Sequence, residues 1–172
     1  LGNVTTYTYD GDGNAATVTA PDGAATACTY DYEGNILSET DPNGNRTLYT
    51  YDGRGRLVAV VDALGGTYRY TYDNAGNRTS QSDPAGRGIT YTYNVRGDLA
   101  ARQYTGEDTA ESYRYTADGL PAEKTGRDGT RTVYTYDGLG RLSCEQAGAN
   151  RKDYTYDRAG NLLTASDGGV VT

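Results

Sequence analysis

Carboxylates are the side chains of this sequence with the greatest capacity for chemistry. The chain has 23 Asp and Glu residues among 172 and contains no His. Two such carboxylates could serve as the acid and the nucleophile or base of a glycosidase. Most of them, however, lie in turn segments such as DGRG at 52–55, where the carboxylate hydrogen-bonds the backbone. With no His, and no Ser or Cys beside a base, we predict no catalytic residues and no enzymatic activity.

The segment DGDGN at 10–14 resembles the beginning of a calcium-binding loop, in which alternate side chains coordinate the ion. The twelfth position of such a loop requires a bidentate Glu, and Pro21 occupies it here. Other copies of the segment replace Asp12 by Glu33, Arg54, Ala75 or Leu139. We therefore predict no metal site and no cofactor.

Tyrosines are the second candidate for a binding function. The chain has 18 Tyr and no Phe, Trp or Met. Pairs such as Tyr49 and Tyr51 could stack on sugars, or they could pack against neighbouring strands. Because the pairs recur in every unit, whereas a binding site would occupy a few, we favour packing, with glycan binding as the alternative.

These residues belong to one repeated motif, Y-x-Y-D-x-x-G-[N/R]-[L/I]. Its second Tyr falls at 9, 30, 51, 72, 93, 115, 136 and 156, a spacing of 20 to 22 residues. A near-constant period indicates one supersecondary unit stacked on itself. We predict a single array of about eight 21-residue repeats over residues 1–172, as a fragment of a longer chain. The structural motif residues include Tyr49, Tyr51, Asp52, Gly55, Leu57, Tyr70, Tyr72, Asp73, Gly76, Tyr134, Tyr136, Asp137, Gly140 and Leu142.

Two turn signals divide each period, D-x-x-G as at 52–55 and D-P-x-G as at 41–44. Asp accepts backbone hydrogen bonds, Pro fixes φ, and Gly tolerates the positive φ predicted at Gly55 and Gly140. The short segments between turns alternate in polarity, as in β-hairpins. Tyr and Thr suit a thin, half-exposed sheet. The predicted fold is therefore all-β, with consecutive antiparallel hairpins in a curved, spiralling single-layer sheet.

Simple alternation predicts which residues share a face. It places Tyr49 and Tyr51 on the face that also carries Leu57 and Ala59 of the returning strand. The slot of Val60 is then assigned to the opposite, polar face. In other copies that slot holds Glu39, Gln81, Arg102, Lys124 and Glu145.

One part of the array departs from the pattern. Pro121 stands in the slot of Leu57 and removes a backbone donor, so we expect a bulge or an edge near residues 104–122. Cys28 and Cys144 occupy slots of the repeat and are interpreted as small packed residues instead of a disulfide pair.

Charge and hydropathy restrict the partners. The net charge is −7 and the basic residues are scattered, so nucleic-acid binding is not expected. No apolar stretch is long enough for membrane insertion. An array of hairpins has two open edges, which predicts edge-to-edge self-association.

The in-phase copies, such as YTYDGRGRL at 49–57 and YTYDGLGRL at 134–142, resemble the YD repeats of the Rhs and teneurin superfamily. This family includes bacterial Rhs toxins, wall-associated proteins and large subunits of Tc-type toxin complexes. The resemblance implies a sheet that spirals into a hollow shell around a C-terminal toxin or cargo domain of the same longer chain. It also implies a structural role in a secreted or cell-surface bacterial protein. The alternative is an extracellular stalk that binds glycans or a partner protein.

Overall fold

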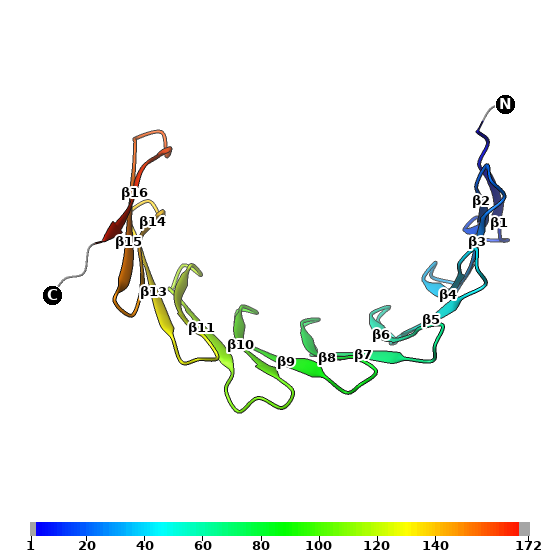
Figure 1. The fold of residues 1–172 in the computed structure, drawn as a ribbon, viewed down its shortest axis with the longest axis horizontal. Helices are drawn as coiled ribbons and strands as arrows, with labels where there is room; N and C mark the ends of the chain where they lie inside the picture. The colour runs from blue at the N-terminus through cyan, green and yellow to red at the C-terminus, as the bar shows by residue number, and fades with distance from the viewer. Residues whose placement is uncertain (1–2, 169–172) are drawn as a thin grey trace. The chain divides into compact units, whose positions relative to one another are not determined.

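The computed structural model describes residues 3–168, which form β-strands joined by short turns (Figure 1). The chain divides into two compact units, Leu1–Gly88 and Ile89–Thr172. The strands of the first unit are β1 (Thr6–Tyr9), β2 (Ala15–Thr19), β3 (Ala25–Tyr30), β4 (Ile36–Thr40), β5 (Arg46–Tyr51), β6 (Leu57–Val61), β7 (Thr67–Tyr72) and β8 (Arg78–Ser82). Those of the second are β9 (Gly88–Tyr93), β10 (Leu99–Tyr104), β11 (Glu111–Tyr115), β12 (Pro121–Thr125), β13 (Arg131–Tyr136), β14 (Leu142–Ala147), β15 (Asn150–Tyr156) and β16 (Leu162–Gly168).

Within each unit, every strand pairs antiparallel with the strands that precede and follow it in the sequence. Figure 1 shows that the sheet of each unit bends along the direction in which strands are added. The predicted all-β, antiparallel hairpin architecture is confirmed. None of the described residues forms a helix with the length and hydrophobicity needed to span a bilayer.

One turn geometry recurs along both units. In the turn after β5, the Asp52 amide donates to the Arg56 carbonyl at 2.9 Å, and the Gly55 amide donates to the Asp52 carbonyl at 2.9 Å. Gly55 has φ of 73° and Gly140 has φ of 77°, as predicted. Such a left-handed residue after a type I turn matches the twist of the two strands. The motif Gly is therefore required by the turn itself.

Replacing Gly55 by Val should destabilise the β5–β6 hairpin by about 1–3 kcal/mol, because a β-branched residue is strained at positive φ. Gly53 lies in the same turn but does not have a positive φ, and a Cβ added there would meet open space. Gly53→Val is thus the matched control and should cost less than about 0.5 kcal/mol. Urea unfolding of the two variants separates them, and equal losses would contradict the assigned turn type.

A β-bulge follows the turn in every Y-x-Y-D hairpin. In the β5–β6 hairpin, Tyr51 lies opposite Leu57 and Thr50 lies opposite Ala59, which leaves Val58 as the extra residue. The same register shift occurs in the other seven hairpins. An inserted residue reverses the alternation of side chains beyond it and increases the local twist.

The bulge corrects the predicted faces. Leu57 does share a face with Tyr51, as expected, but Ala59 lies opposite Thr50 and Val60 lies opposite Tyr49. Directly opposed residues share a face. We call the face of Tyr49, Tyr51 and their equivalents the tyrosine face, and the face of Thr50 and its equivalents the threonine face. The charged slot therefore lies on the tyrosine face, where it holds Glu39, Gln81, Arg102, Lys124 and Glu145.

The small residues of the Ala59 slot lie on the threonine face, where they pair with Thr across the hairpin. The Thr29 and Ser38 hydroxyls are 2.8 Å apart, and those of Thr155 and Thr164 are 2.6 Å apart. Among the described residues only Ser38, Glu111 and Cys144 are buried, and no side chain is fully enclosed. Each unit is thus a single-layer wall, as the Tyr and Thr composition predicted.

The irregular region is explained by its connections. Pro121 lies opposite Tyr115 at a bulge, as expected, but no edge forms because β11 pairs with both β10 and β12. The strands β10 and β11 are joined by residues 105–110, which lengthens the interval from Tyr93 to Tyr115 to 22 residues. The strands β14 and β15 are joined by a tight turn at 148–149, which shortens the interval from Tyr136 to Tyr156 to 20.

Candidate functional site

The joint between consecutive hairpins is the most elaborate repeated feature of the molecule. The first part of this joint is the turn formed by the Asp of the motif. One Asp52 oxygen accepts the Arg54 amide at 2.9 Å and the Arg56 amide at 3.1 Å, and the other accepts Arg56 Nε at 2.8 Å. The hydrogen bond from Arg56 is the main cause that lowers the pKa of Asp52 to about 2. The carboxylate closes the turn and leaves no free oxygen for catalysis.

Arg at the motif's [N/R] position extends the joint to the next hairpin. Arg56 Nη1 donates to the Asp73 carbonyl at 2.8 Å, and its guanidinium lies 4.8 Å from the centre of the Tyr72 ring. Arg141 repeats both contacts, with the Asp157 carbonyl at 2.9 Å and the Tyr156 ring at 4.7 Å. A cation over an aromatic face is attractive in addition to the hydrogen bond. At these joints the ring face that could have stacked on a sugar is covered by Arg.

The second Tyr of the motif completes the joint from the other side. Tyr72 Oη donates to the Leu57 carbonyl at 2.9 Å. Leu57 lies outside the β6–β7 ladder, which starts at Ala59, so the hydroxyl satisfies a carbonyl at the bulge. The same bond joins Tyr30 to Ala15, Tyr115 to Leu99, Tyr136 to Pro121 and Tyr156 to Leu142. Phe could not make this bond, which gives a physical reason for Tyr in the second position of the motif.

Replacing Tyr72 by Phe should destabilise the first unit by about 1 kcal/mol, because the Leu57 carbonyl loses its donor while the ring remains. Tyr68 of the same strand is 37% exposed and donates no hydrogen bond to another described residue. Tyr68→Phe should therefore leave stability within about 0.5 kcal/mol of the parent. Urea unfolding of both variants provides the comparison. Equal effects would show that the hydroxyl bond contributes nothing.

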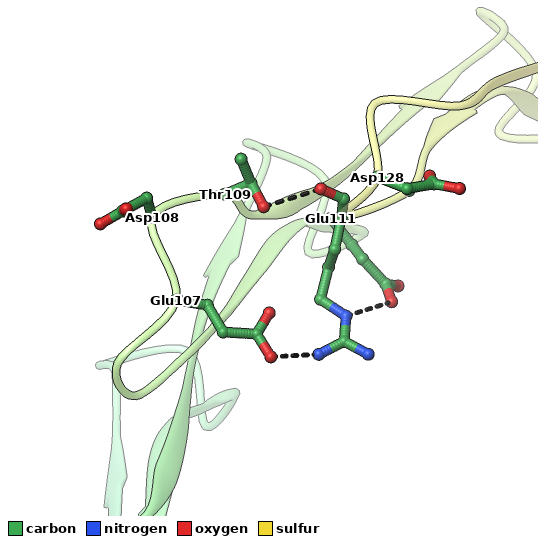
Figure 2. A pocket seen from close by; sticks show the side chains of 7 residues that line it. Glu107, Asp108, Thr109, Glu111 and Asp128 are labelled. Carbon is green, nitrogen blue, oxygen red and sulfur yellow. Dashed lines mark hydrogen bonds and ion pairs between the residues drawn. The ribbon is translucent and has the colours of Figure 1, made fainter.

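A second cluster lies where the repeat is irregular, and Figure 2 shows its acidic side chains around an open hollow. Glu111 is 8% exposed and is the centre of the cluster. Its carboxylate accepts Arg102 Nε at 2.8 Å and the Tyr113 hydroxyl at 2.7 Å, and Lys124 Nζ lies 3.9 Å away. Arg127 lies 3.9 Å from Glu111 and pairs with Glu107.

The pKa values follow these contacts. Hydrogen bonds from Tyr113 and then Arg102 hold the pKa of Glu111 below its ordinary value despite burial. Burial, followed by the hydrogen bond to Glu111, raises the pKa of Tyr113 to about 12. At neutral pH the cluster is an ionised carboxylate surrounded by cations, so Glu111 is not poised to transfer a proton. The Thr109 hydroxyl donates to the Arg127 carbonyl at 2.7 Å and ties the 105–110 connection to the turn after β12.

The tyrosine face also carries an aromatic groove of about 460 Å³ in the second unit, beside Pro121. Its walls are Tyr113, Tyr115, Tyr134 and Tyr136. Three of the four hydroxyls already donate to Glu111 or to backbone carbonyls. The groove therefore presents ring surface more than free polar groups.

The predicted motif residues have several distinct structural roles. Asp52, Asp73 and Asp137 close turns, Gly55, Gly76 and Gly140 provide positive φ, and Tyr72 and Tyr136 donate to the preceding hairpin. Tyr49, Tyr70 and Tyr134 lie on the tyrosine face opposite Val60, Gln81 and Glu145. Tyr51 opposes Leu57, and Leu142 supplies the carbonyl for Tyr156. Motif reasoning missed the Glu111 cluster, although the 22-residue interval marked its location.

The other candidate residues have structural contacts. The Asp10 carboxylate accepts the Asp12 and Asn14 amides at 3.0 and 2.9 Å and the Asn14 side chain at 3.1 Å. Within residues 3–168, no group of three His, Cys, Asp or Glu side chains has the arrangement of a metal site. Both cysteines are free thiols, with Cys144 buried and Cys28 half-buried.

Comparison with known proteins identifies similar repeats. A family model described as RHS Repeat matches residues 30–67, 52–87 and 115–152, which together cover more than half of the chain. No curated protein sequence matches.

Solved toxin structures have a similar fold. A crystal structure of TcdB2-TccC3-TEV superposes with a TM-score of 0.53 at 17% identity, over 95% of this chain and 12% of that chain. A crystal structure of TcdB2-TccC3 gives 0.51 at 16% identity, over 95% and 13%. The Photorhabdus luminescens Tc holotoxin pore gives 0.51 at 16% identity, over 95% and 12%. The chain thus spans about an eighth of the length of these structures, and the likeness is one of fold.

Proposed function

Because this chain belongs to the RHS repeat family, we propose that it forms part of the wall of a shell that encloses a C-terminal toxin or other cargo domain. The shell would belong to a longer bacterial protein that is secreted or displayed at the cell surface. The enclosed domain and the rest of that chain are then the partners of this segment. Its role is mechanical, and we assign it no reaction.

The single-layer sheet is the observation that carries this proposal. A globular domain seals large side chains between layers, whereas no described side chain here is fully enclosed. The hairpins instead satisfy exposed turn and bulge groups through Asp contacts within the turns, Tyr hydroxyl bonds at five joints, and Arg contacts at the Arg56 and Arg141 joints. Such a sheet is stable as a thin wall and can extend by addition of repeats. This favours a container over a catalytic domain.

We further propose that the tyrosine face lines the interior. That face combines Tyr rings with the charged slot at Glu39, Arg102, Lys124 and Glu145. Its rings offer apolar contact, while the charges keep water at the surface. A lining of this kind would contact an unfolded cargo chain without holding it tightly. The threonine face would then be the outer surface.

Thiol labelling of the longer protein tests the proposal. Leu48 on the threonine face is 42% exposed and Tyr68 on the tyrosine face is 37% exposed, so the two are matched reporters. Leu48→Cys and Tyr68→Cys would be placed separately in a Cys28→Ala and Cys144→Ala background. A maleimide carrying a long polyethylene glycol chain should label Leu48→Cys and spare Tyr68→Cys in the native protein. Both should react after denaturation.

Two other outcomes would contradict parts of the proposal. Protection of Leu48→Cys alone would reverse the assigned faces while retaining the enclosure. Rapid labelling of both positions in the native protein would rule out enclosure of this segment and favour an extracellular stalk.

A further inference from the structure

One joint of the second unit lacks the guanidinium groups that close a joint of the first. In the first unit, Arg54 and Arg56 of one turn each donate to a main-chain carbonyl of the next turn, both at 2.8 Å. The same two positions of the turn between β11 and β12 hold Asp118 and Leu120. Leu120 cannot form a side-chain hydrogen bond, whereas this [N/R] position of the motif holds Asn, Asp or Arg in the other seven copies.

A hollow of about 550 Å³ lies at this joint. Asp118 and Leu120 line it from the turn after β11, and Tyr136, Asp137 and Gly138 line it from the end of β13 and the turn that follows. The carbonyls of Asp137 and Gly138 are the counterparts of the two that accept arginine in the first unit. Among the described residues, the Asp137 carbonyl accepts only a main-chain amide of its own turn, at 2.9 Å. The hollow is therefore the vacant place of an arginine.

The hollow also has an aromatic face and a carboxylate without a partner. Tyr136 is the counterpart of Tyr72 and Tyr156, whose ring centres lie 4.8 and 4.7 Å from a guanidinium carbon. Within residues 3–168, no cation lies over the Tyr136 ring. The Asp118 side chain is exposed and forms no hydrogen bond or ion pair with another residue in that range. Ring faces, carbonyls and carboxylates are the groups that bind a guanidinium.

We infer that this hollow binds an arginine side chain of another polypeptide. The guanidinium would lie over Tyr136, donate to the two free carbonyls and pair with Asp118, since its planar fork carries five donors. A volume of about 550 Å³ suits a ligand larger than one side chain, which favours an arginine within a peptide over a free guanidinium ion. The net charge of −7 attracts a basic partner. This inference does not depend on the shell proposed above, because the site lies wholly within the second unit.

Peptide titration of the whole chain, followed by ¹H–¹⁵N NMR, tests the inference. The probe is the blocked tripeptide alanine–arginine–alanine, and its controls carry lysine or uncharged citrulline in place of arginine. Saturable shifts should appear at the amides of Asp118 and Gly138. The lysine peptide should bind at least about 3-fold more weakly, because an ammonium lacks the planar fork. Asp118→Asn should weaken binding of the arginine peptide about 2- to 5-fold, the range of an exposed ion pair.

Rebuilding the joint provides a second test. Thr116→Asp with Leu120→Arg supplies the Asp–Arg pair that closes the β5–β6 turn at 2.7 Å. The chain's own guanidinium should then fill the hollow and weaken peptide binding at least about 10-fold, because an attached group competes at high effective concentration. The urea midpoint should rise, which would show that the loss is not due to unfolding. Ala63→Asp with Leu64→Arg adds the same charges to an exposed turn of the first unit and should leave peptide binding unchanged.

Three results would overturn the inference. Equal, unsaturated shifts with the arginine and lysine peptides would reflect diffuse attraction of any cation to an acidic chain. Undiminished binding to the Thr116→Asp, Leu120→Arg variant would place the peptide elsewhere on the molecule. Binding of free guanidinium ion as tight as that of the arginine peptide would show that the hollow takes a small cation and does not recognise a polypeptide.

Discussion

Acidification to about pH 2 should open the Asp turns of this sheet and leave the Asn94 turn closed. The Arg56 hydrogen bond and the backbone amides lower the pKa of Asp52 from 3.8 to about 2. Hydrogen bonds to neighbouring amides, side chains or both lower the pKa of several other turn carboxylates, which are Asp10, Asp31, Asp41, Asp73, Asp83, Asp137 and Asp157. A depressed folded-state pKa stabilises the folded chain above pH 3.8, and the stabilisation is lost as the pH falls through the folded value.

The turn at Asn94 is an internal control for the Asp turns. Asn94 Oδ1 accepts the Arg96 and Asp98 amides at 2.9 and 3.0 Å, so the backbone amides of this turn bond to an oxygen that does not titrate. The Asp98 carboxylate of the same turn accepts only side-chain groups, with Asn94 Nδ2 at 3.0 Å and Arg96 Nε at 3.6 Å. Hydrogen exchange, corrected for the intrinsic effect of pH, should show the amides at 54–56 losing protection while those at 96–98 keep theirs. Asp52→Asn should transfer this pH independence to the β5–β6 turn. Equal loss of amide protection in both turns would show that protonation of Asp52 is not what opens the β5–β6 turn.

Replacing Glu111 by Ala should destabilise the second unit by about 2 kcal/mol, the scale of lost hydrogen bonds to a charged group. The substitution removes the acceptor of Arg102 and Tyr113 and leaves Arg102, Lys124 and Arg127 facing one another. The Glu111 carboxylate is buried, but the side chains of Arg102, Lys124 and Arg127 are 34%, 41% and 45% exposed, so water screens part of their mutual repulsion. The expected loss therefore comes mainly from the hydrogen bonds that the carboxylate accepts. Thermal or urea unfolding would measure the loss.

Glu107 is the matched control for Glu111. It also pairs with Arg127, but its side chain is 37% exposed, so Glu107→Ala should cost less than about 1 kcal/mol. In a double-mutant cycle, Arg102→Ala should cost much less in the Glu111→Ala background than in the parent. A Glu111→Ala variant as stable as Glu107→Ala would show that the buried cluster contributes little.

The period and the turn chemistry of this fold were predictable from sequence, and the assignment of faces was not. Each D-x-x-G segment encodes its own turn, because Asp accepts the amides that follow it and Gly takes positive φ. The bulge has no comparable signal within its own strand. Val58 is apolar like its paired neighbours Leu57 and Ala59, so counting by twos from Leu57 assigned Ala59 and Val60 to the wrong faces.

A signal for the bulge existed in the pairing of hydroxyl residues. Thr recurs between the two tyrosines and Ser or Thr recurs in the Ala59 slot, a combination that favours direct cross-strand contact such as Thr71 with Ser80. For the Glu111 cluster the sequence indicated only a location, through the 22-residue interval, and not its members. Its members lie on β10, β11, β12 and the turn after β12, and only the three-dimensional register brings these residues together.

The acceptor of the Tyr joint is always a main-chain carbonyl, whatever side chain that residue carries. Ala15, Leu57, Leu99, Pro121 and Leu142 all serve as acceptor, because a backbone oxygen is present in every residue type. This bond therefore does not require a matched pair of side chains to change together when one hairpin follows another. Gene duplication or deletion in steps of one period would preserve it, so copy number in such arrays can vary while individual repeats diverge.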